Sequence, residues 1–177
     1  LYTPYEMRII GALIRMGEKK RALSLVDRFL ADRRPAGWNE WAEVVVRDPR
    51  KPQFLGDMPH AWIASDFIRS ILDAFAYDRD DGTLVVGAGV PRSWIGRGTL
   101  HVGPLPTWHG PIDIRMTAPA GDRIVVELSG TASPKAIVVH SPDERPLRRS
   151  VVDGTEVPHP NDTVTITQLP AAITFEY

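Results

Sequence analysis

The hydrophobic residues of positions 1–30 recur three and four residues apart, which is the spacing of one face of a helix. The first stripe predicts a helix from Thr3 to about Gly17, a residue type that ends helices in the left-handed conformation. The second stripe predicts a helix that ends at Arg33-Arg34 before Pro35, and so short a connection makes the two an antiparallel hairpin. The stripes consist of Ile9, Ile10, Leu13 and Ile14, and of Ala22, Leu23, Val26, Phe29 and Leu30.

A third helix is predicted from near Pro59 to Ala76, after a stretch without period over residues 35–59. Its apolar positions cover more than one face, so we expect this helix to lie between other elements. They are Trp62, Ile63, Phe67, Ile68, Ile71, Leu72, Phe75 and Ala76.

Beyond the turn sequence Asp80-Asp81-Gly82 the hydrophobic period changes to two, which is typical of strands. Leu84-Val85-Val86 is expected to be the first strand, and Asp153-Gly154 predicts a tight hairpin. Such a pattern indicates an antiparallel sandwich or jelly roll of roughly seven to nine strands. The other strands are expected at residues 112–116, 124–128, 164–166 and 173–177.

Glycine and proline support this division, since residues 1–80 contain 4 Gly and 5 Pro and residues 81–177 contain 10 and 11. We therefore predict an α+β chain with a helical domain over residues 1–80 and a β-sandwich domain over residues 81–177.

Composition excludes several classes of function. The 177 residues include 21 Lys plus Arg against 22 Asp plus Glu, a balance that offers no electrostatic footprint for nucleic acid or a membrane surface. The absence of cysteine excludes a thiolate nucleophile and a Cys-ligated metal. The histidines of the second domain have no spacing typical of a metal site, and we expect neither a metal nor a cofactor.

Residues 37–62 carry the candidate chemistry, because tryptophan faces stack on sugar rings and carboxylates act as general acid, general base or hydroxyl acceptor. The sequence itself is also compatible with tryptophans that seal a core and with solvated carboxylates. The candidates are Trp38, Glu40, Trp41, Glu43, Asp57, His60 and Trp62.

Three segments, GWNEWAE (37–43), GDMPHAWIASDFIR (56–69) and LVVGAGVPRSWI (84–95), resemble the end of a six-hairpin glycosidase. These enzymes are (α/α)6-barrel glycoside hydrolases, and the α-L-rhamnosidase type is the nearest pattern. In that group a Trp–Glu segment, a His-containing loop, the last barrel helix and a C-terminal β-sandwich follow in this order. The resemblance covers residues 35–110, with Met58-Pro59 where that group usually has an Asn before its His.

The resemblance implies that residues 1–80 are the C-terminal helices of such a barrel. It implies Glu43 as general base, with Glu40 as the competing choice, and His60 and Asp57 as groups that bind a hydroxyl or orient the base. Trp38, Trp41 and Trp62 would form walls of the sugar subsite. The partner acid of this group lies upstream, and the chain starts at Leu1 within a helical pattern, so we expect a C-terminal part that is inactive alone.

Two other functions fit the sequence. A non-catalytic carbohydrate-binding or structural sandwich would use Trp94 or Trp108 as its platform. An assembly domain would bury uncovered helix faces against a second copy or against the upstream catalytic portion of the same protein.

Overall fold

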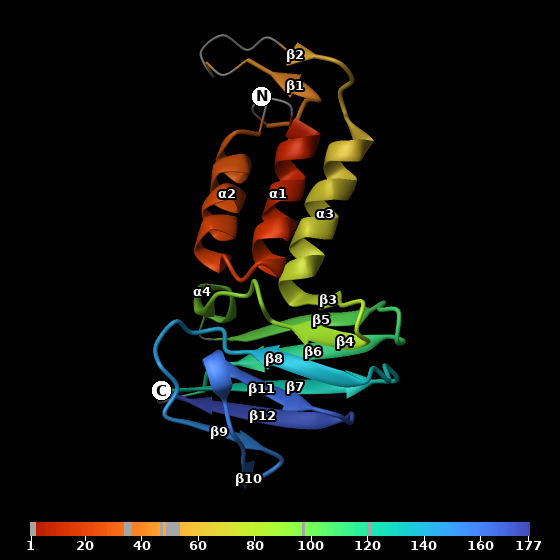
Figure 1. Ribbon diagram of the computed structural model, residues 1–177. Helices are drawn as coiled ribbons and strands as arrows, with labels where there is room; N and C mark the ends of the chain where they lie inside the picture. The colour runs from red at the N-terminus through yellow and green to blue at the C-terminus, as the bar shows by residue number, and fades with distance from the viewer. Residues whose placement is uncertain (1–2, 34–36, 47, 49–53, 97, 120–121) are drawn as a thin grey trace. The chain divides into compact units, whose positions relative to one another are not determined.

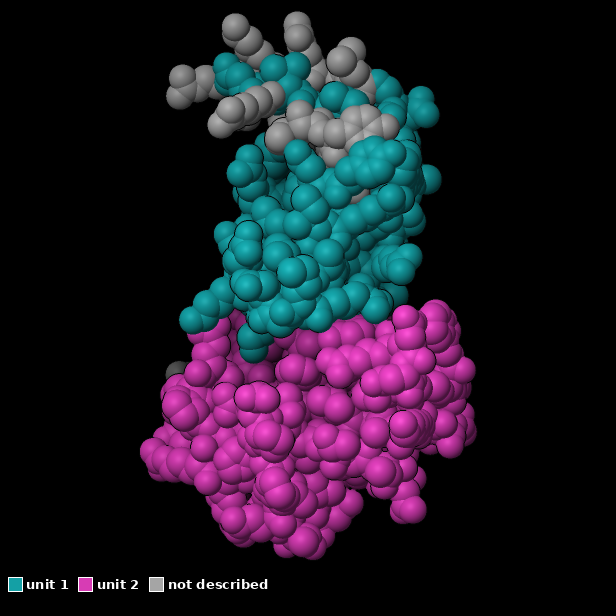
Figure 2. Space-filling view, in the orientation of Figure 1, with its two compact units in different colours: residues 1–74 teal, residues 75–177 magenta. Residues whose placement is uncertain are grey.

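The computed structural model describes residues 3–33, 37–46, 48, 54–96, 98–119 and 122–177. It consists of two compact units, residues 1–74 and residues 75–177, which are coloured separately in Figure 2. The first unit contains three helices and the second contains two β-sheets, so the predicted α+β class is confirmed. No helix among the described residues has the length and hydropathy of a membrane span.

The first two helices form the predicted hairpin. Helix α1 (Thr3–Arg15) and helix α2 (Lys19–Ala31) are joined around Gly17, whose φ of 80° requires the left-handed region. Glu18 N–H closes the turn by donating to the carbonyl of Leu13 over 2.8 Å. Most of the two predicted stripes is buried, including Ile10, Leu13, Ile14, Ala22, Val26 and Phe29. Two positions differ from the prediction, because Ile9 is 46% exposed and Met7, outside the predicted stripes, is fully buried.

Helix α3 (Ala61–Phe75) packs against α1 with a polar stripe rather than with its apolar one. Asp66 pairs with Arg8 and Asp73 with Arg15, so the two helices run parallel, and α1 lies between α2 and α3 (Figure 1). Ile68 and Leu72 remain 56% and 36% exposed. The expectation that α3 lies between other elements is therefore not met by the described residues.

A pair of two-residue strands lies in the segment without period. Strand β1 (Val44–Val45) and strand β2 (Phe54–Leu55) are antiparallel, with Val44 opposite Leu55 and Val45 opposite Phe54. Strands this short show no alternation in the sequence, which is why none was expected here.

The second unit is a sandwich of a six-stranded and a four-stranded sheet (Figure 1). The first has the order β10-β9-β12-β7-β6-β5 and the second the order β11-β8-β4-β3. Their bounds are β3 (Ala76–Asp78), β4 (Thr83–Val86), β5 (Thr99–Leu105), β6 (Ile112–Thr117), β7 (Arg123–Gly130), β8 (Ala136–His140), β9 (Arg149–Val152), β10 (Thr155–Glu156), β11 (Thr163–Ile166) and β12 (Ala171–Glu176). Two short helical segments are α4 (Arg92–Ile95) and η1 (Pro160–Asp162).

The alternating positions of the six-stranded sheet form the core, and the Asp153-Gly154 hairpin is confirmed, with φ of 48° and 86°. Two details differ from the sequence prediction. Strand β3 precedes the expected first strand, because the chain passes directly from α3 into the sheet and pairs with β4. Strands β4 and β8 pair in parallel, so the sandwich is not wholly antiparallel. Core residues include Ile112, Ile114, Met116, Ile124, Val126, Leu128, Ile173 and Phe175.

Candidate functional site

The pairing of β1 with β2 determines where Glu43 lies. Because Val44 is opposite Leu55, the preceding residue Glu43 comes next to Gly56 and Asp57. The backbone N–H of Asp57 donates to Glu43 Oε2 over 3.4 Å. Gly56 has a φ of 87°, and a Cβ at this position would collide with the Glu43 carboxylate. Glycine is therefore required here both for the backbone conformation and for the close approach of the carboxylate.

His60 lies at the start of α3 and caps it. The N–H of Ile63 donates to His60 Nδ1 over 3.3 Å, so the neutral imidazole carries its proton on Nε2. His60 Nε2 is 3.8 Å from Glu43 Oε2, with side chains that are 11% and 24% exposed. The helix cap thus fixes the tautomer and orients the Nε2 proton toward the carboxylate.

A cavity of about 340 Å³ adjoins this pair within the helical unit. Its volume falls in the range of small-molecule sites, about 300–1,000 Å³. His60, Glu40 and Arg33 are its ionisable lining groups, and apolar side chains such as Phe67 and Ile68 form much of the rest. Glu40 thus lines the cavity itself, whereas Glu43 reaches His60 at its margin.

Trp41 anchors the segment to both neighbouring helices. Its indole Nε1–H donates to the carbonyl of Phe29 over 2.7 Å, and its ring lies 4.9 Å from that of Phe67. The carbonyl of Phe29 belongs to the last turn of α2 and also accepts from the N–H of Asp32 over 3.1 Å, so Trp41 is its second donor. Trp41 also lines the cavity, and the Nε1–H of its ring is already hydrogen-bonded to Phe29.

The remaining sequence candidates lie apart from the cavity lining. Trp38 is 61% exposed, and Asp57 contacts Glu43 through its backbone. Trp62 lies on the side of α3 that faces α1, edge-on to Tyr5 at 5.3 Å. The Arg8 guanidinium lies 5.0 Å from the Trp62 ring. The structure thus brings together Glu40, Trp41, Glu43 and His60 of the predicted set.

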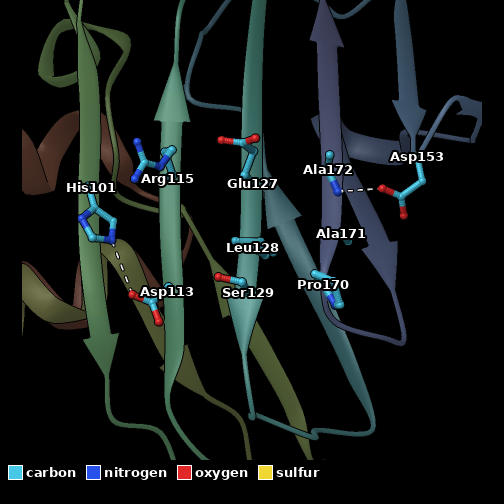
Figure 3. A pocket seen from close by; sticks show the side chains of 10 residues that line it. All are labelled: His101, Asp113, Arg115, Glu127, Leu128, Ser129, Asp153, Pro170, Ala171 and Ala172. Atoms are coloured by element: carbon cyan, nitrogen blue, oxygen red, sulfur yellow. Dashed lines mark hydrogen bonds and ion pairs between the residues drawn. The ribbon is translucent and has the colours of Figure 1, made fainter.

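A second hollow, of about 500 Å³, lies on the outer face of the six-stranded sheet (Figure 3). Its polar lining groups stand at alternate positions of β6 and β7, a pattern that any solvated sheet face shares, and sequence reasoning missed it. Neither of the tryptophans considered for the sandwich lines it. The Trp94 ring lies 5.8 Å from that of Phe75, and Trp108 is 79% exposed.

Within the described parts of the chain, no three His, Asp or Glu side chains come together in a group that could hold a metal ion.

No protein-family model matches the chain, and no curated protein matches its sequence. Among solved structures, the chain is similar to a GH127 β-L-arabinofuranosidase from Geobacillus stearothermophilus T6, at 9% identity and a TM-score of 0.36. The match covers 71% of this chain and 20% of that enzyme, so the chain spans about a fifth of its length.

Proposed function

We propose that this chain forms part of the sugar-binding site of a glycoside hydrolase, in which Glu43 is the general base. The observation that carries the proposal is the Glu43–His60 pair, 3.8 Å apart and beside a cavity of about 340 Å³. The resemblance of residues 37–43 and 56–69 to the end of a six-hairpin glycosidase supports the same assignment.

Glu43 is favoured over Glu40 because its carboxylate is held in place. The N–H of Asp57 and the imidazole of His60 both approach Glu43 Oε2, and a base must be held within hydrogen-bond reach of the water it deprotonates. His60 is a positioning residue in this proposal, since its Nε2 proton is directed at Glu43 or at a sugar hydroxyl between them. Glu40 remains the competing carboxylate, because it lines the cavity.

Glycoside hydrolysis needs two carboxyl groups, which stand about 6.5–9.5 Å apart in inverting enzymes. The partner acid is proposed to come from a portion of the protein outside this chain. We therefore expect the chain to bind a monosaccharide or a short glycoside without hydrolysing it.

The test is a titration of the 177-residue chain with a panel of methyl glycosides, including those of L-rhamnose and L-arabinose, followed by two-dimensional amide NMR. We expect shifts at the amides of Asp57 and Ile63, and we expect Glu43→Gln to abolish them. His60→Asn preserves an N-cap acceptor and should weaken binding, whereas Glu40→Gln serves as the matched carboxylate control.

Two results would contradict the proposal. One is that no glycoside shifts these amides in the wild-type chain. The other is that Glu43→Gln binds as well as wild type while Glu40→Gln does not, which would transfer the role to Glu40. Amide spectra of the free variants report directly whether each retains its fold.

A further inference from the structure

The hollow on the outer face of the six-stranded sheet is lined mainly by polar and charged side chains. His101 of β5, Arg115 of β6 and Glu127 of β7 are consecutive cross-strand partners, and Glu127 is in turn opposite Ala172 of β12. A second row runs beside the first, with Asp113 of β6 opposite Ser129 of β7. Figure 3 shows these side chains projecting from one face of the sheet.

Two carboxylates of this hollow are held in fixed positions. Asp113 Oδ1 lies 3.4 Å from His101 Nε2, and a Cβ on the adjacent Gly103 would collide with the Asp113 carboxylate. At the other end, Asp153 Oδ1 accepts a hydrogen bond from the N–H of Ala172 over 2.9 Å. Gly103 thus leaves room for the Asp113 carboxylate, and a hydrogen bond from the start of β12 holds the Asp153 carboxylate.

The central pair behaves differently. Arg115 and Glu127 carry opposite charges and are direct cross-strand partners, an arrangement that normally favours an ion pair. Their side chains nevertheless form no ion pair or hydrogen bond with any residue that the structure describes, and neither does the hydroxyl of Ser129. In Figure 3 the guanidinium of Arg115 is directed toward the strand of His101, away from Glu127.

The hollow therefore offers the guanidinium of Arg115 as donor and the carboxylate of Glu127 as acceptor in one cross-strand row. The hydroxyl of Ser129 stands in the adjacent row. A sugar hydroxyl donates and accepts at the same time, so it satisfies such interleaved groups, and hydrogen bonds to charged groups are the strong ones. Three carboxylates against one guanidinium disfavour a polyanion. The small side chain of Ala172, beside Glu127, leaves a shallow, open site suited to a chain of sugar units.

We propose that this hollow is a second, non-catalytic site that binds a neutral oligosaccharide, with Arg115 and Glu127 as its central contacts. Asp113 and Ser129 extend the site along β6 and β7. The site lies wholly within the second unit and shares no residue with the Glu43–His60 pair. A test of oligosaccharide binding at this hollow can therefore succeed or fail independently of the proposed role of Glu43.

The experiment measures retardation of the chain in native gels that contain a neutral polysaccharide, with arabinan, xylan and mixed-linkage β-glucan as probes. Arg115→Ala and Glu127→Gln should each weaken binding at least fivefold. Arg123→Ala removes an exposed arginine from the start of β7 and should leave binding unchanged.

The proposal is overturned if none of the neutral polysaccharides retards the chain, or if the Arg115→Ala/Glu127→Gln double variant binds as well as wild type. Tighter binding to polygalacturonate or to a chitosan oligomer than to every neutral glycan would also overturn it, because the ligand would then be recognised by its charge. All substituted side chains are exposed, and amide spectra of the variants establish that the sheet is intact.

Discussion

Arg15 on α1 donates two hydrogen bonds to Asp73 on α3, from Nε to Oδ2 over 3.0 Å and from Nη2 to Oδ1 over 2.8 Å. Arg8 and Asp66, each seven residues earlier on its helix, form the equivalent contact over 2.7 Å. Equal spacing on both helices is possible only when they run parallel in this register. Gly11 lies between the arginines, and a Cβ there would be 2.9 Å from Asp73 Oδ2, which shows how closely the helices approach.

Replacing Asp73 by Asn should destabilise the helical unit. Asp73 is 8% exposed, and its loss leaves the Arg15 guanidinium with weaker partners. Hydrogen bonds to charged groups contribute about 1.5–3 kcal/mol, and the partial exposure of Arg15 places the expected loss near the lower end of that range. Urea unfolding followed by circular dichroism at the helix band measures it. Asp27→Asn, on the exposed face of α2, should leave the midpoint in place; equal effects of the two variants would refute the role of the pair.

This ion-pair ladder explains why the sequence predicted α1 and α2 better than the surroundings of α3. The buried stripes of the hairpin are purely apolar and can be read from period alone. On α3 the buried stripe mixes the apolar Ile63 and Ala74 with Asp66, Ser70 and Asp73, and Ser70 Oγ donates to the carbonyl of Met7. Which side of such a helix is buried depends on partners that are distant in sequence, so Ile63, Phe75 and Ala76 are buried as expected whereas Ile68 and Leu72 are exposed.

The candidate site shows the same limit. Tryptophan and glutamate spacing singled out Glu40 and Glu43 together, but could not separate them. The β1–β2 pairing, made of two residues on each strand, places Glu43 against Gly56 and near His60. No period marks so short a pairing in the sequence. The groups of the sheet hollow were likewise visible only as alternating polar residues until the register aligned Arg115 with Glu127.

Replacing Gly56 by Ala should displace the Glu43 carboxylate. The new Cβ would occupy space held by that carboxylate, in addition to the cost of a left-handed alanine, about 1–2 kcal/mol. Gly37→Ala is a matched control, because Gly37 has a φ of 85° and a methyl group added there would meet nothing within 4 Å among the described residues.

We expect both glycine variants to lose a similar amount of stability, because each forces an alanine into the left-handed region. Only Gly56→Ala should change the environment of His60. Long-range nitrogen–proton NMR of the imidazole reads out the tautomer and the Nε2 environment. Identical imidazole spectra for the two variants would show that Gly56 does not position Glu43.

His60 itself has two separable roles. His60→Ala removes the acceptor for the Ile63 N–H and should cost about 0.5–2 kcal/mol, as the loss of other N-caps does. His60→Asn supplies a new cap acceptor and should recover most of that stability without restoring the group near Glu43. Thermal unfolding of the two variants measures the difference, and equal stabilities would show that the cap contributes nothing.

The stability of the sandwich should fall in acid through Asp143. Burial raises the pKa of Asp143, but hydrogen bonds and charge from Arg145 and a hydrogen bond from Arg92 lower it more, so the pKa lies below its ordinary 3.8. A carboxyl with a depressed folded-state pKa stabilises the fold above its unfolded pKa, and this contribution is lost as the pH falls through the folded value. Arg145 also pairs with Asp122 over 2.8 Å and lies 5.0 Å from the Tyr177 ring, so the cluster ties the chain end to the sheet.

Asp143→Asn should therefore lower the unfolding temperature at neutral pH and flatten its decline as the pH falls from about 5 to values below 3.8. Asp80→Asn, at an exposed position in the turn before β4, should keep the wild-type profile. Calorimetry of the three proteins across this range measures both effects. If the unfolding temperature of Asp143→Asn declined with pH as steeply as that of the wild type, other groups would cause the acid sensitivity. The reason is that an amide does not titrate, so it cannot lose its contacts with Arg145 and Arg92 by protonation.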